Sequence, residues 1–203
     1  MQWHEQYEIP DSDLSRRLQV VVERLSEALD SLRAESPKLL SLCAGEGRDV
    51  ISVLRADPGS RVSAVLVESN PVLAERARDA ASSSGISGLE VRCADAGDPG
   101  SFRDVVPVDV LLLCGIFGNV EPASVRHIVD VVPSMVNQGG YVIWTRGGSE
   151  PDWRPVIREW FESAGIEELA FEGAPATYGV GLNRVIANRP LSSCLEERLF
   201  SFA

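Results

Sequence analysis

The feature that most constrains the fold of this chain is a short glycine-containing stretch at residues 39–49, LLSLCAGEGRD. It begins as an apolar run after Pro37, which is typical of a buried strand, and then breaks into small residues. Val50, Ile51 and Leu54 follow at helical spacing, so a strand, a tight turn and a helix start are expected. Glycine tolerates positive φ and a helix start offers unpaired N–H groups, so a small polar ligand can bind there. An ordinary turn without a ligand is the alternative.

The rest of the chain alternates between strand-like and helical patterns. Further strands are expected at residues 62–67, 89–93, 108–113, 141–145, 166–171 and 178–187. Helices are expected at residues 12–34, from the glycine turn to 55, at 71–82, 122–135 and 151–165, with a weaker one near 100–105. Residues 137–140 are expected to form a turn before the fifth strand. This alternation predicts a parallel sheet with helices on both faces.

Length and composition predict one main domain with extensions. The chain has 203 residues, of which 44% are hydrophobic, which is enough for a sizeable core. We expect an N-terminal lid segment and helix at residues 1–36, an α/β domain at 37–189 and a C-terminal tail at 190–203. No apolar run approaches the ~20 residues of a membrane span, and residues 1–6 lack the pattern of a signal peptide. A cytoplasmic location without membrane partners is therefore expected.

Charge and cysteine spacing exclude two further classes of site. The net charge is −11, and the basic residues are scattered, whereas nucleic-acid binding requires a basic surface. No nucleic-acid partner is expected. The four cysteines lack paired metal spacing, and the two histidines lie far apart, so we expect reduced thiols and no metal. The sequence leaves the oligomeric state open.

Polar or small residues recur at the predicted carboxyl ends of four strands. The glycine turn follows the first strand, Glu68 ends the second, Asp95 follows the third, and Cys114 and Gly115 follow the fourth. Ligands of open α/β sheets bind beyond these strand ends, near the point where the strand order reverses. Glu68 has the acceptor capacity for two ribose hydroxyls, and Asp95 for an exocyclic adenine amine. A helix-capping role for Glu68 and a solvated loop position for Asp95 are the alternatives.

An adenosine-binding site fits either NAD or S-adenosylmethionine, and the glycine turn distinguishes them. A dinucleotide site places a third glycine where this chain has Val50. Glu46 would also lie inside a turn that must hold a pyrophosphate. S-adenosylmethionine has no phosphate, and its positive sulfonium suits an acidic surrounding, so these residues favour it.

Residues 37–187 resemble the class I S-adenosylmethionine-dependent methyltransferases. The stretch 39–48 looks like the first motif of that family, 65–71 (VLVESNP) like its ribose motif and 93–96 (CADA) like its adenine motif. The resemblance implies a Rossmann-like, seven-stranded, mostly parallel sheet with helices on both faces and an antiparallel last strand. It implies S-adenosylmethionine as methyl donor and, within the family, a small-molecule acceptor of the kind used by uncharacterised bacterial members. The expected cofactor-binding residues are Cys43, Ala44, Gly45, Gly47, Glu68, Ser69, Asp95, Ala96, Cys114 and Gly115.

Two departures from the family pattern concern the same turn. The usual acid of the first strand is Ser41 here, and the first glycine of the loop is Cys43. The amino-acid end of the cofactor is then expected to contact the backbone of Ala44 and Gly45. After the fourth strand stands CGIFGN, in place of the Asn/Asp-Pro-Pro-aromatic motif of enzymes that methylate exocyclic amines.

Acceptor-binding residues are expected from two regions. Trp3, His4 and Tyr7 belong to the N-terminal segment, which either closes as a lid over the site or is a frayed end. Near the strand ends, Phe117, Asn119, Arg146 and Tyr178 are candidates for shaping an acceptor pocket, though each is also a common packing or loop residue. His4 is a candidate base, but no catalytic residue is identified. An NAD(P)-dependent oxidoreductase and a non-catalytic S-adenosylmethionine-binding protein are the competing functions.

Overall fold

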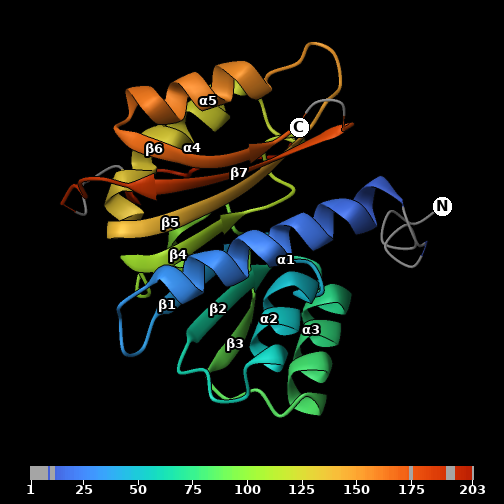
Figure 1. Cartoon of the computed structure of the whole chain (residues 1–203). Coiled ribbons are helices and arrows are strands. Elements are labelled where there is room, and N and C mark those ends of the chain that lie inside the picture. Colours follow the sequence, from blue (N-terminus) through green and yellow to red (C-terminus); the bar gives the residue numbers. More distant parts are fainter. Residues whose placement is uncertain (1–8, 10–11, 174–175, 191–194, 203) are drawn as a thin grey trace.

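The computed structural model describes residues 9, 12–173, 176–190 and 195–202, and its elements follow the expected order (Figure 1). The helices are α1 (Asp13–Ser31), α2 (Arg48–Ala56), α3 (Pro71–Ser83), α4 (Pro122–Met135) and α5 (Arg154–Ser163), with a 3₁₀ turn η2 (Pro99–Ser101). The strands are β1 (Lys38–Leu42), β2 (Ser63–Glu68), β3 (Leu89–Cys93), β4 (Val108–Leu113), β5 (Val136–Gly147), β6 (Ile166–Glu172) and β7 (Tyr178–Val185).

The strands form one seven-stranded sheet in the order β3-β2-β1-β4-β5-β7-β6. Five neighbouring strands, β3 to β5 in this order, pair in parallel, while β7 runs antiparallel to both β5 and β6. The expected sheet with an antiparallel last strand is confirmed. Because the chain leaves β1 toward β2 and later returns to its other side as β4, the strand order reverses between β1 and β4.

Three element boundaries differ from the sequence-based expectation. The turn expected at residues 137–140 lies inside β5, where it forms an irregularity: Val108 pairs with Val136 and Val110 with Tyr141. Gly139 has φ 81°, a conformation that glycine adopts without strain. Helix α5 begins at Arg154 and not at Pro151, and the weak helix expected near 100–105 is the 3₁₀ turn η2.

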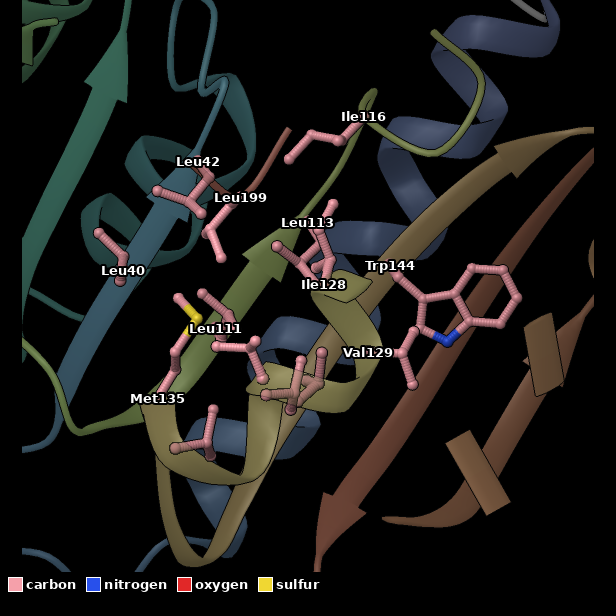
Figure 2. Packing of buried hydrophobic residues seen from close by; sticks show 14 of the residues in the cluster. Leu40, Leu42, Leu111, Leu113, Ile116, Ile128, Val129, Met135, Trp144 and Leu199 are labelled. Carbon is pink, nitrogen blue, oxygen red and sulfur yellow. The ribbon is translucent and has the colours of Figure 1, made fainter. Parts of the chain in front are cut away.

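The strands are buried on both faces, as a parallel sheet between helix layers must be. Figure 1 shows α1, α2 and α3 on one side, and α4 and α5 on the other. On the α4 side, alternate residues of β1 and β4 pack against α4, as Figure 2 shows for Leu40, Leu42, Leu111, Leu113, Ile128 and Val129. The intervening residues, such as Leu39 and Leu112, pack against α1 and α2 on the opposite face.

The two terminal regions pack onto this framework. Helix α1 contacts α2, β5 and β7, and the Ser12 side chain caps it by accepting from the Ser15 N–H at 3.1 Å. At the other end, Leu195, Leu199 and Phe200 are buried in the core cluster on the α4 side. Figure 2 shows Leu199 among these residues. The described residues include no helix with the length and apolarity that crossing a bilayer requires.

Candidate functional site

A cavity of about 250 Å³ lies beyond the carboxyl ends of β1, β2 and β4, where the strand order reverses. Ligands of α/β sheets bind at this position. The residues that line it come from α1, β1, the glycine turn, the start of α2, the end of β2, α3 and the loop after β4. They are Arg17, Leu18, Ser41, Cys43, Ala44, Gly45, Glu46, Arg48, Asp49, Glu68, Leu73, Cys114 and Gly115. We call this space the strand-tip cavity.

The turn between β1 and α2 contains three residues with left-handed backbone conformation. They are Cys43, Gly45 and Gly47, with φ of 57°, 58° and 65°. Gly47 also approaches β2 closely, because a Cβ atom built on it would overlap the buried side chain of Leu66. This turn therefore requires glycine at position 47 for both its φ and its packing, and α2 begins directly after it.

The carboxylate of Glu68 holds the strand-tip cavity together from the end of β2. Its Oε2 accepts from the Gly45 N–H at 2.8 Å, and its Oε1 accepts from the Asn70 N–H at 2.7 Å. The residue is 8% exposed and lines the cavity. Each carboxylate oxygen has a second lone pair, so Glu68 can still accept hydrogen bonds from a ligand.

Glu46 projects from the glycine turn and binds two arginines. Its carboxylate accepts from Arg48 at 2.7 Å and from Arg76 at 2.8 Å. Burial by itself would raise the pKa of Glu46, but the hydrogen bonds from Arg76 and Arg48 outweigh it, and the pKa lies below its ordinary value. Glu46 is therefore ionised at neutral pH, and the two arginines balance its charge.

The two thiols of the strand-tip cavity are protonated at neutral pH. Burial, assisted by the charges of Glu68 and Asp95, raises the pKa of Cys43 to about 12. Burial and the charge of Asp49 also raise the pKa of Cys114. Because the thiolate is the nucleophilic form, neither cysteine is set up to act as a nucleophile.

The loop after β3 is held by the C-terminal tail. Asp95 Oδ1 accepts from the Gly97 N–H at 2.8 Å, and Asp95 Oδ2 forms an ion pair with Arg198. The Leu199 N–H donates to the Gly97 carbonyl at 2.9 Å. A Cβ on Gly97 would overlap the Phe200 carbonyl oxygen, so tail and loop are in close contact.

A second cavity, of about 620 Å³, lies at the end of β5 between the loop after β4 and helices α4 and α5. We call it the aromatic cavity. Its lining residues are Phe117, Gly118, Asn119, Val120, Glu121, Pro122, Val125, Arg146, Trp153, Ile157, Trp160 and Phe202. One loop connects the two cavities, because Gly115 lines the first and Phe117 the second.

The predicted cofactor residues fall into two groups. The strand-tip cavity brings together Cys43, Ala44, Gly45, Glu68, Cys114 and Gly115. Gly47 packs beneath the turn, whereas Ser69, Asp95 and Ala96 are not among the lining residues.

The predicted acceptor residues divide in the same way. Phe117, Asn119 and Arg146 line the aromatic cavity. Tyr178 packs instead in the core with Val20 and Val21 of α1. Trp3, His4 and Tyr7 lie outside the described residues. Within the described part, no cluster of three or more His, Cys, Asp or Glu side chains is arranged to hold a metal ion.

Sequence reasoning missed several lining residues that come from other elements. Arg17 and Leu18 of α1 line the strand-tip cavity, and Trp153 and Trp160 line the aromatic cavity. The sequence predicted helices at residues 12–34 and 151–165, and it assigned none of these four residues to a site. Phe202 lies in a tail without a recognisable pattern. Two tryptophans seven residues apart, so close to Arg146, were the available signal.

Comparison with protein families assigns the class. The family described as "Putative methyltransferase" matches residues 12–160, which is more than half of the chain, so this protein belongs to that family. No curated protein gives a significant match.

Solved structures with the same fold include several methyltransferases. An O-methyltransferase family protein from Burkholderia thailandensis has a TM-score of 0.62 at 15% identity, over 85% of this chain and 59% of that one. An O-methyltransferase family 2 protein from Planctomyces limnophilus, in complex with apigenin, has a TM-score of 0.60 at 19% identity, over 84% and 59%. This chain thus spans 59% of the length of each.

A third neighbour was solved with cofactor product and substrate. It is the 1,6-didemethyltoxoflavin-N1-methyltransferase of Burkholderia thailandensis, with 1,6-didemethyltoxoflavin and S-adenosylhomocysteine bound. Its TM-score is 0.63 at 14% identity, over 83% of this chain and 77% of that one. At these identities the likeness establishes the fold, which is the class I methyltransferase fold.

Proposed function

We propose that this protein is an S-adenosylmethionine-dependent methyltransferase that acts on a small-molecule acceptor. The observation that carries the proposal is the strand-tip cavity, where Glu68 and the glycine turn meet beside the reversal of strand order. Family membership supports it, as do neighbours solved with S-adenosylhomocysteine. We assign the cofactor contacts to the ten residues expected from the sequence, with Arg17 and Leu18 covering the site.

The residues of the turn fit a sulfonium nucleoside better than a dinucleotide. A pyrophosphate bound at the start of α2 would compete with Glu46 for Arg48, which is already paired with that carboxylate. Val50 is fully buried at the place of the third dinucleotide-site glycine. A cationic ligand gains from the carboxylate of Glu68, which lines the cavity and accepts from backbone N–H groups, so this residue argues against the oxidoreductase alternative.

The chain's own contribution to catalysis is alignment. Bound S-adenosylmethionine supplies an electrophilic methyl group, and holding the acceptor in line with it lowers the barrier without a covalent step on the protein. Gly45 and Glu68 position the cofactor, while Phe117, Asn119 and Arg146 orient the acceptor. A base is needed only if the acceptor must lose a proton.

Thermal unfolding with S-adenosylhomocysteine tests the cofactor. A ligand at about 100 times its Kd stabilises a protein by about 2.7 kcal/mol, which is roughly 5–10 °C in Tm for a chain of this size. We expect such a rise with S-adenosylhomocysteine and none with NADH. Glu68→Gln should reduce the rise, whereas the control Glu162→Gln, an exposed residue of α5, should leave it unchanged. No rise at about 1 mM of either S-adenosylmethionine or S-adenosylhomocysteine would contradict the proposal, and saturable NADH binding would favour an oxidoreductase.

Cofactor binding without catalysis is the second candidate function. One observation favours it: no histidine is among the described lining residues of either cavity, so a common general base is missing there. A protein of this kind would bind S-adenosylhomocysteine yet transfer no methyl group to any member of a broad acceptor panel. A cytoplasmic location and the lack of nucleic-acid and membrane partners stay predictions.

A further inference from the structure

The aromatic cavity combines aromatic walls with the guanidinium of Arg146, whose Nε has no hydrogen-bond partner among the described residues. We propose that it binds an aromatic carboxylic acid as the methyl acceptor, with the carboxylate on Arg146 and the ring against the aromatic side chains. A hydroxyl oxygen or amine nitrogen elsewhere on the ring bonds to the methyl carbon as the S–CH3 bond of the sulfonium breaks. The sulfur leaves as the neutral thioether, and the proton of the acceptor atom passes to solvent. This inference rests on the proposed function, because it names the substrate class of the same reaction. The aromatic cavity has a volume of about 620 Å³, which accommodates a drug-sized ring system.

Arg146 is the residue from which we infer that the ligand is an anion. Its Nε is buried and has no hydrogen-bond partner in the described part of the protein. Burial lowers the pKa of Arg146; the charge of Asp152 opposes this shift, and that of Arg154 adds to it. The Asp152 carboxylate is already occupied, since it accepts from Arg154 Nε and Nη2 at 2.8 Å each. An unpaired buried donor on a guanidinium is costly, and the guanidinium of Arg146, which lines the cavity, can pair with a ligand carboxylate.

The surroundings hold the guanidinium against the loop after β4. A Cβ on Gly118 would lie 3.1 Å from Arg146 Nη1, so glycine at this position leaves room for the guanidinium beside the backbone. Glu121 also lines the cavity, but it is exposed and forms no ion pair with Arg146 within the described residues. The positive group therefore remains available to a ligand, although the chain as a whole has a net charge of −11.

The walls select a planar ring. Trp153 and Trp160 lie with ring centroids 6.0 Å apart and planes tilted by 38°, and both line the cavity. Phe117 closes the inner end and Phe202, from the C-terminal tail, the outer rim, where it is 51% exposed. Aromatic side chains bind flat apolar ligands through large contact areas, and a guanidinium pairs with a carboxylate at the ring edge.

Arg146 lies next to the strand-tip cavity, and two hydrogen bonds of Gly115 fix this arrangement. The Gly115 N–H donates to Thr145 Oγ1 at 3.0 Å, and Arg146 directly follows Thr145. The Asn119 side chain donates to the Gly115 carbonyl at 2.8 Å. Gly115 and Arg146 are therefore fixed relative to each other, so a ring anchored at Arg146 lies beside the cofactor site.

The test is binding of 2-naphthoate to the full chain, with neutral 2-naphthamide as the matched probe, measured by titration calorimetry. We expect wild type to bind 2-naphthoate at least about tenfold more tightly, which corresponds to about 1.4 kcal/mol. Arg146→Gln should remove this preference, and Arg146→Lys, which keeps the charge without the planar fork, should retain part of it. The control is Arg126→Gln, because Arg126 lies 6.0 Å from the Trp160 ring but pairs with Asp130.

Each outcome of these titrations either supports or contradicts the binding of a carboxylate at Arg146. Equal affinity for both probes in wild type, or a preference that survives Arg146→Gln, overturns the inference, as does a preference that depends on Arg126. Trp160→Leu should weaken both probes alike. Every variant is also titrated with S-adenosylhomocysteine. Normal binding of S-adenosylhomocysteine confirms that a variant is folded. If no protein binds S-adenosylhomocysteine, the proposed cofactor fails, whereas the naphthoate preference is judged separately.

Discussion

Cys43 adopts a left-handed backbone conformation at the end of β1, with φ 57°. For a residue with a Cβ atom this conformation costs roughly 1–2 kcal/mol, and it persists only where the surroundings enforce it. Here the side chain packs against the core on the α4 side and also lines the strand-tip cavity. The turn geometry is therefore retained at a cost in stability, as is common at ligand sites.

The neighbouring Gly47 offers a matched test of packing at the turn. We expect Gly47→Ala to lower the free energy of unfolding by about 2–4 kcal/mol, because strain at φ 65° adds to an overlap with buried Leu66. Gly85→Ala is the control: its φ is 66°, but a Cβ there meets nothing within 4 Å. Urea unfolding measures both, and equal losses would show that packing against Leu66 contributes nothing.

The C-terminal tail acts at the scale of the element. Leu199 and Phe200 are buried in the core on the α4 side, and Arg198 binds the carboxylate that the sequence assigns to the adenine amine. The loop after β3 is thereby held by a segment more than a hundred residues away. If an adenine binds at Asp95, the Asp95 carboxylate must either accept from the adenine amine and Arg198 together or release Arg198.

Removing the tail's arginine tests this competition. We expect Arg198→Ala to raise the affinity for S-adenosylhomocysteine, by at most about fivefold, because a half-exposed ion pair is worth under about 1 kcal/mol. Stability should change little for the same reason. Arg103→Ala, which removes a longer contact to Glu196 of the same tail, is the control. A weaker affinity after Arg198→Ala would indicate that the arginine supports the cofactor site.

The whole molecule places two half-buried thiols at one edge of its sheet. Cys43 and Cys114 line the same cavity, and burial raises the pKa of both. The unfolded chain releases these protons near pH 8.5, its ordinary thiol pKa. A group whose pKa is higher in the folded state contributes stability that is complete below the unfolded pKa and is lost as the pH rises toward the folded one.

The free energy of unfolding should therefore fall between about pH 9 and about pH 11, by up to about 1.4 kcal/mol per pH unit for each thiol. We expect Cys43→Ala and Cys114→Ala each to make this decline shallower. Cys93→Ala, at an exposed thiol, should leave it unchanged. Urea unfolding across this pH range measures the slopes, and identical slopes for wild type and both variants would refute the linkage.

Local patterns determined the order of the elements and half of the site. Each strand or helix shows its own hydrophobic period, of two or 3.6 residues, and glycines mark where it ends. The alternation of strands and helices, and hence the sheet, could therefore be predicted from the sequence. Parallel strands end at a common edge, which is why Glu68, Gly45 and Cys114 were expected together and do line one cavity. Only the tertiary structure placed Arg17 over that cavity and Arg198 on Asp95. It also brought Trp160 and Arg146 to the same cavity. Such contacts join segments that are distant in sequence. They depend on how the elements pack, and no local hydrophobic pattern predicts them.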